Sequence, residues 1–110
     1  MTKFSDVMQE AIVNWPWTES KYPRLEGMSV PDQDRFAFRH IIFHAQKSLG
    51  KLAEFEERLD HGAKLGTPAR RMQGTVAAKM LINAYQLAHL AGLDPDSLLR
   101  EVRVMLAKNA

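Results

Sequence analysis

The residues best suited to chemistry lie on one side of residues 36–61, FAFRHIIFHAQKSLGKLAEFEERLDH. Steps of four, seven, eleven and fourteen positions from the first histidine of this stretch return to one face of an α-helix. The resulting polar stripe comprises His40, His44, Lys47, Lys51 and Glu54. Because the stripe is mostly basic and runs along the longest predicted helix, we expect the function of the protein to depend on it.

The histidine pair on this stripe is the first candidate for a metal site. Two histidines four positions apart on a helix can bind a transition metal. Between His40 and His44 stand only apolar residues, so no glutamate is available as a catalytic base. The sequence identifies no third ligand, and it contains no cysteine. We therefore predict no metal site and interpret the two histidines as surface or interface residues.

The elements that must position these residues are predicted to be helices, because apolar residues recur at helical spacing and no strand-like alternation is present. A short helix over residues 3–14 precedes a connector that ends at Pro31. The long helix then runs to about His61 and stops at Gly62, and a second long helix covers residues 68–91. The last helix starts at Asp94. The fold class is all-α, with four helices and a central antiparallel pair of long helices.

Two apolar patterns on these helices predict how they pack. A line of mostly small residues on the second long helix lets another helix approach closely, so we expect the tightest helix contact of the fold there. This line comprises Ala77, Leu81, Ala84, Ala88 and Ala91. On the last helix we expect five apolar side chains to face inward. They are Leu98, Leu99, Val102, Met105 and Leu106.

The connector between residues 15 and 31 contains three prolines, two tryptophans and a tyrosine. The simpler interpretation is that Trp15 and Trp17 pin this connector to the helices, because aromatic side chains bury large areas. The alternative is that they form the wall of a pocket for a planar base.

Length and composition indicate one small domain over residues 1–110, with an N-terminal helix and connector in 1–35 and core helices in 36–110. Because the helices are long for so short a chain, we expect the bundle to be completed in a homodimer or higher homo-oligomer. A net charge of +2 with scattered basic residues argues against nucleic-acid binding. No signal peptide or membrane span is recognised, so we predict a soluble, cytoplasmic protein without membrane contact.

Two segments carry a resemblance to a known family. They are residues 47–62, KSLGKLAEFEERLDHG, and residues 76–109, VAAKMLINAYQLAHLAGLDPDSLLREVRVMLAKN. Their frame of leucines, alanines and glycines resembles the two signature helices of the MazG-like all-α nucleoside-triphosphate pyrophosphohydrolases. That superfamily includes phosphoribosyl-ATP pyrophosphatases and dimeric dUTPases. The resemblance implies a MazG-like helical fold in which five acidic residues hold Mg²⁺ on the triphosphate of the substrate.

This chain departs from the family pattern at all five of those acidic positions. The aligned residues are Lys47, Ser48, Lys51, Val76 and Lys79. Mg²⁺ needs oxygen ligands, normally including carboxylates, and ammonium groups repel it. We therefore predict a MazG-like protein without Mg²⁺-dependent pyrophosphohydrolase activity and without a cofactor, which acts as a structural, regulatory or interaction protein.

Two alternatives stay open. In the first, the protein is a divergent nucleoside-triphosphate pyrophosphohydrolase whose Mg²⁺ is held by displaced carboxylates, Glu54, Glu57 and Asp60, although these residues also fit a solvated helix end. In the second, the lysines converge as the acids of the family do and bind a nucleotide or phosphate without metal. The residues of this anion site are Lys47, Lys51 and Lys79, with Lys108 and Asn109 matching the C-terminal Lys-Asn of the family.

Overall fold

The computed structural model describes residues 3–14, 16–62, 64 and 67–109. Within these residues every regular element is helical, as the sequence predicted, and the order is four α-helices with one short 3-10 turn. The elements are α1 (Phe4–Asn14), η1 (Pro23–Leu25), α2 (Val30–Asp60), α3 (Thr67–Leu90) and α4 (Pro95–Lys108).

The ends of α2 follow from local sequence. Ser29 precedes the helix in an extended conformation, and its hydroxyl accepts a hydrogen bond from the Asp32 backbone N–H, while Pro31 occupies the first turn. The predicted start near Pro31 is therefore confirmed. At the other end Gly62 has a φ of 93°, a backbone conformation that favours glycine.

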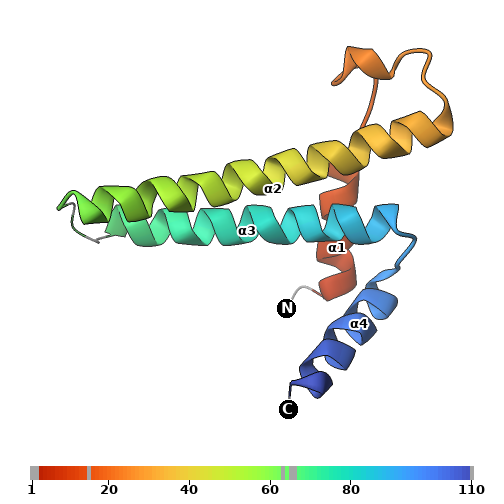
Figure 1. Cartoon of the computed structure of the whole chain (residues 1–110). Helices are drawn as coiled ribbons and strands as arrows, with labels where there is room; N and C mark the ends of the chain where they lie inside the picture. Colours follow the sequence, from red (N-terminus) through yellow and green to blue (C-terminus); the bar gives the residue numbers. More distant parts are fainter. Residues whose placement is uncertain (1–2, 15, 63, 65–66, 110) are drawn as a thin grey trace.

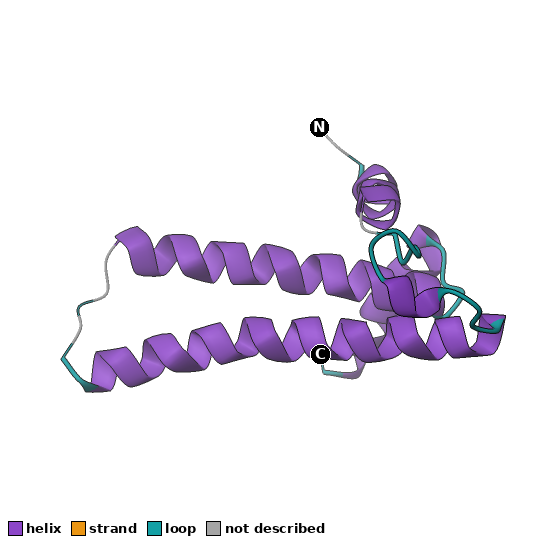
Figure 2. Cartoon of the chain, turned by 90° about the horizontal axis from the view of Figure 1, so that it is seen from above, coloured by secondary structure: helices purple, strands orange, loops and turns teal. Residues whose placement is uncertain are grey.

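Helices α2 and α3 lie side by side and run antiparallel along most of their length (Figures 1 and 2), so the predicted central pair is confirmed. Their contact combines apolar residues, Ile41 and Val76, with three buried polar ones, Ser48, Asn83 and Gln86. These polar residues lie on the sides of α2 and α3 that face each other. The contact between the two helices, which we call the seam, is therefore partly polar.

The prediction that the line of small residues on α3 makes the tightest helix contact is wrong. Of that line only Ala88 is buried, whereas Ala77, Ala84 and Ala91 are exposed and Leu81 keeps 49% of its surface accessible. The reason is rotational: the buried seam residues Asn83 and Gln86 turn a different side of α3 toward α2.

Helix α1 crosses the hairpin near the end of α3 (Figure 1) and supplies the main apolar core. Met8 and Ala11 pack against Tyr85 and Ala88, each 5% exposed or less. The ring of Phe4 meets that of Tyr85 edge-on at a centroid distance of 5.3 Å. The main apolar core thus lies between α1 and α3 rather than between the two long helices.

The turn between α3 and α4 is closed by backbone hydrogen bonds around Gly92, whose φ is 80°. Gly92 N–H donates to the His89 carbonyl and Leu93 N–H to that of Ala88, the pattern of a Schellman motif. Asp94 then caps α4 by accepting a hydrogen bond from the Ser97 N–H at 2.8 Å. The predicted start of the last helix is confirmed.

Helix α4 leaves the hairpin and makes its main contact with α1 (Figure 1). Met105 keeps 62% of its surface accessible and Leu106 66%. Of the five residues predicted to face inward, Leu98 packs against the core of α1 and α3, whereas the prediction is wrong for Met105 and Leu106, because no other described helix lies over that part of α4. Among the described residues, no helix is long and apolar enough to cross a membrane.

Candidate functional site

A cavity of about 260 Å³ lies between α2 and α3 on the side of the polar stripe. Both helices contribute residues at positions i, i+3, i+4 and i+7, the spacing that keeps four side chains on one face. The lining residues are His44, Lys47, Ser48 and Lys51 of α2, with Lys79, Ile82, Asn83 and Gln86 of α3. The three lysines that the sequence singled out therefore line one shared cavity.

The lysines are close enough to influence one another. The nearby positive charge of Lys51 is the main cause that lowers the pKa of Lys79, and the charge of Lys47 lowers it further. Partial burial lowers the pKa of His44, and the charges of His40, Lys47 and Lys21 lower it further. The cavity therefore concentrates positive charge with no carboxylate in its lining.

Neutral hydrogen-bonding groups form the inner part of the cavity. Ser48 is 5% exposed, Asn83 8% and Gln86 7%, and all three line it. The Ser48 hydroxyl and the Asn83 amide can donate hydrogen bonds to an oxyanion at fixed positions, while the lysines supply charge from longer, more mobile side chains. This combination of donors suits an anion.

The donor set does not suit Mg²⁺. Of the five positions aligned with the acids of the MazG-like family, Lys47, Ser48, Lys51 and Lys79 line the cavity, and Val76 is buried beside it with 1% exposure. Mg²⁺ requires oxygen ligands in octahedral geometry, which three ammonium groups and one hydroxyl cannot supply.

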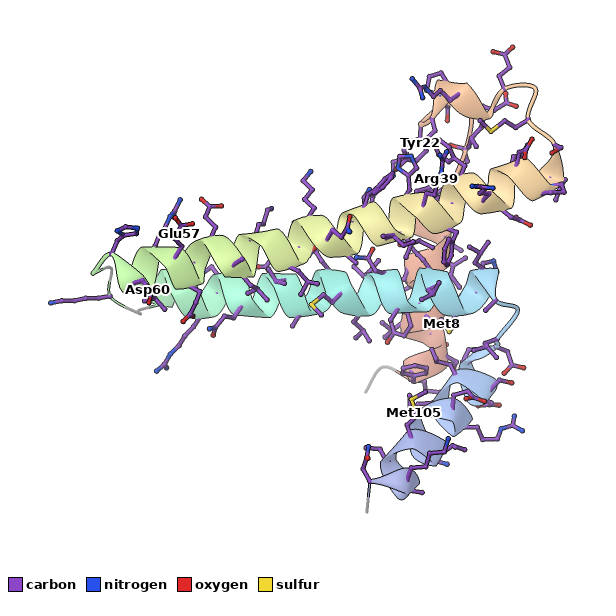
Figure 3. The ribbon with its side chains drawn as sticks, viewed as in Figure 1. Met8, Tyr22, Arg39, Glu57, Asp60 and Met105 are labelled. Carbon is purple, nitrogen blue, oxygen red and sulfur yellow. The ribbon has the colours of Figure 1, made fainter. Side chains whose placement is uncertain are left out.

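The acidic residues lie elsewhere. Glu57 and Asp60 are near the turn end of the hairpin (Figure 3), and Glu54 forms an exposed ion pair with Arg58 at 2.7 Å. Glu54 and Glu57 line a shallow depression with Arg58, whereas Asp60 lines neither this depression nor the lysine cavity. Within the described part of the chain, no three histidine, aspartate or glutamate side chains could share a metal ion.

Lys108 and Asn109 are not brought to the cavity. They stand at the end of α4, where the Asn109 side-chain amide donates to the Met105 carbonyl at 3.3 Å. Neither residue lines the space between α2 and α3. Since α4 turns away from the hairpin at Gly92, sequence position alone could not indicate this separation.

An aromatic cluster beside the cavity was only partly anticipated. The ring of His40 lies 4.2 Å from Phe36, 5.1 Å from Tyr22 and 5.9 Å from Trp17, measured between centroids. Trp17 also lies 6.0 Å from His44, so the connector packs directly on the polar stripe. This supports the anchoring role predicted for Trp17, while Trp15 lies outside the described residues.

Trp17 also lines a second cavity of about 410 Å³, where Gln33, Asp34 and His89 supply polar groups. Gln86 borders both this space and the lysine cavity, so the two are neighbours. The aromatic residues of the connector were the feature of the sequence that pointed to a pocket here. Their contact with the polar stripe could not be predicted, because it depends on how the connector folds back onto α2.

Comparison with known proteins finds no relative: no family model matches the chain, and neither a curated protein nor a solved structure matches it. The resemblance to the MazG-like family therefore stays a prediction.

Proposed function

We propose that the protein binds a phosphate group or a similar oxyanion in the cavity between α2 and α3, without a metal. The observation that carries this proposal is the shared cavity of Lys47, Lys51 and Lys79, in which Lys51 lowers the pKa of Lys79. An anion between these ammonium groups replaces their mutual repulsion by attraction, so binding and charge relief act together.

The neutral groups of the cavity add directionality to this charge. Ser48 and Asn83 are buried between the helices and are held by helix geometry, so little conformational entropy is lost when an oxyanion meets them. A phosphate of a nucleotide and a free phosphate present the same oxygens to these donors. The binding chemistry is therefore that of a phosphoryl oxyanion, whichever molecule carries it.

Binding rather than hydrolysis is proposed because no carboxylate lines the cavity that the lysines share. Glu54 is engaged with Arg58, and Glu57 lies with it in a separate depression. If the chain shares ancestry with MazG-like pyrophosphohydrolases, it has replaced three of their five metal-holding acids by lysines and the other two by Ser48 and Val76. The predicted cytoplasmic location is compatible with such a ligand and stays a prediction.

Calorimetric titration with phosphate, sulfate and ATP in the presence of EDTA tests the proposal. We expect saturable binding of at least one of them, weakened about tenfold or more by Lys51→Glu, since the substitution replaces an attractive charge by a repulsive one. Lys108→Glu makes the same change of charge on α4, away from the cavity, and is expected to leave the affinity within about twofold at moderate salt.

Two results would contradict the proposal. One is the absence of binding for all three anions, and the other is equal loss of affinity in Lys51→Glu and Lys108→Glu, which would indicate only a response to net charge. Robust pyrophosphate release from nucleoside triphosphates with Mg²⁺ or Mn²⁺ would instead favour a hydrolase that uses Glu54, Glu57 or Asp60.

A role as a structural or interaction protein is the second candidate. It is favoured by the apolar side chains that the single chain leaves accessible on α2, α3 and α4. Such a role is compatible with anion binding, because the accessible apolar residues and the cavity occupy different surfaces.

A further inference from the structure

The α2–α3 hairpin has two different sides. A step of one residue turns a helix by about 100°. On α2, His40 and Lys47 precede the buried residues Ile41 and Ser48 by one position and belong to the cavity side, while Ile42 and Leu49 follow them by one position. The same seam residues therefore separate a basic side of α2 from an apolar side.

Helix α3 repeats this division. Ile82 lines the cavity and precedes the buried Asn83, whereas Ala84 follows it. When two helices pack antiparallel, the residues that follow the contact residues by one position lie on the same side of both helices. The apolar residues of α2 and α3 therefore share one surface, opposite the lysines. We call it the apolar face; it comprises Phe38, Ile42, Leu49, Met80, Ala84 and Leu87.

The apolar face is accessible and uncharged. Phe38 keeps 46% of its surface accessible, Leu49 51% and Leu87 43%. The connector does not cover it, because Trp17 and the end of α1 border the hairpin on the side of Gln86 and Ala37. Helix α1 packs on Tyr85 and Ala88, and α4 departs toward α1. No described element of the same chain therefore closes this face.

The accessible surface area of the whole chain indicates how much area a partner would have to bury. Its accessible area is 8563 Å², whereas a folded monomer of 12.5 kDa is expected to expose about 6,200 Å². The excess is roughly 2,400 Å² per chain, and stable homodimers bury about 2,000–5,000 Å² in total. A second copy that covers part of this excess thus suffices for a stable interface.

We propose that a second copy of this chain covers the apolar face, so that two hairpins form a four-helix bundle. The surface is self-complementary in chemistry, since uncharged side chains of α2 and α3 meet the same set from the partner. Charge favours this arrangement over the opposite one: pairing through the cavity sides would bring two sets of Lys47, Lys51 and Lys79 together. The inference does not depend on whether the cavity binds an anion.

Analytical ultracentrifugation of the full chain tests this interface. We expect a mass of at least twice 12.5 kDa at tens of micromolar protein. Ile42→Asp and Leu87→Asp each place a charge in the buried contact and are expected to raise the dissociation constant by about 100-fold or more. Val13→Asp is the matched control, because Val13 is 60% exposed on α1 and lies outside the apolar face.

Thiol labelling gives a second measurement that does not rely on disruptive variants. The chain contains no cysteine, so Ile42→Cys and Val13→Cys each carry a single thiol. At high protein concentration we expect the thiol at position 42 to react with maleimide roughly tenfold more slowly than that at position 13, and the difference to shrink on dilution.

A wild-type chain that stays monomeric, with equal labelling at both positions, would overturn the proposal and leave the face to a different partner. An oligomer that survives both aspartate variants, or one in which position 42 reacts as fast as position 13, would place the contact elsewhere and overturn it equally. If either aspartate variant loses its helical circular dichroism, the labelling result decides.

Discussion

At the scale of single residues, the cavity is defined by like charges held close together. Lys51 and Lys79 come from different helices, and neither has a carboxylate in the cavity lining to offset its charge. Such an arrangement costs free energy in the absence of a ligand. Because an anion in the cavity would offset this cost, the cluster of lysines supports a binding role.

His44 provides a pH-dependent readout of this environment. Burial and neighbouring cations hold its pKa in the folded chain below the ordinary value of 6.5. The unfolded chain therefore binds more protons in this range, so the free energy of unfolding rises with pH up to about the ordinary value and falls as His44 is protonated on acidification. In His44→Gln we expect this part of the pH dependence to disappear.

Urea unfolding of both proteins between about pH 5 and pH 8 measures the effect. High salt screens the contributions of His40, Lys47 and Lys21 but not that of burial, so the slope of the wild-type protein should become shallower without vanishing. Identical slopes for wild type and His44→Gln would show that His44 is not in the environment described.

At the scale of elements, stability is divided unequally between the helices. Met8 is 2% exposed in the core between α1 and α3, whereas Met105 is 62% exposed on α4 (Figure 3). The two residues are of one type, so they isolate the effect of burial. Their comparison tests whether α1, rather than α4, completes the core.

Met8→Ala is expected to lower the free energy of unfolding by about 2–5 kcal/mol, because it removes buried contacts and leaves a cavity. Met105→Ala should change it by less than about 0.5 kcal/mol. Chemical denaturation at one fixed protein concentration measures both. Similar losses in the two variants would mean that α4 is buried to a degree not seen in the single chain.

The helices themselves could be predicted from sequence because their ends are coded locally. Pro31, Gly62, Gly92 and Asp94 act through backbone geometry and hydrogen bonds within a few residues, so the boundaries were predicted closely. What covers an apolar side could not be predicted. Periodicity marked the alanine line of α3, but it carries no information on which neighbour occupies that side.

The candidate site was predictable to a similar extent. That Lys47 and Lys51 share one face follows from helical spacing alone, whereas Lys79 was predicted as a site residue only from the resemblance to a family. Asn83 and Gln86 were not among the residues predicted for the site, although they are buried between the helices and line the cavity. Polar residues ordinarily mark solvent, so a seam that buries them is invisible to a hydrophobicity pattern.

At the scale of the whole molecule, the chain is too extended for its length. Its radius of gyration is 17.0 Å, compared with about 13 Å for a compact domain of 110 residues. The hairpin projects beyond the core that α1 provides, as Figure 1 shows. Assembly through the apolar face would compensate for this shape by supplying buried area that the single chain lacks.

Thermal stability should therefore depend on protein concentration. If folding and association are linked, Tm rises by several degrees as the concentration increases from one to one hundred micromolar, because mass action favours the assembled folded state. Differential scanning fluorimetry over this range measures the shift, and Ile42→Asp should abolish it. A constant Tm in the wild-type protein would indicate that the chain is stable without a partner.

The core between α1 and α3 also determines the order in which the chain folds. Met8 meets Tyr85 and Ala88, so this contact closes a loop that includes most of the chain, whereas α2 and α3 meet across a short connector. Loop-closure entropy grows with the enclosed length, and local contacts form faster. We therefore expect the hairpin, with its lysine cavity, to form early, and α1, the helix that is synthesised first, to dock on it afterwards.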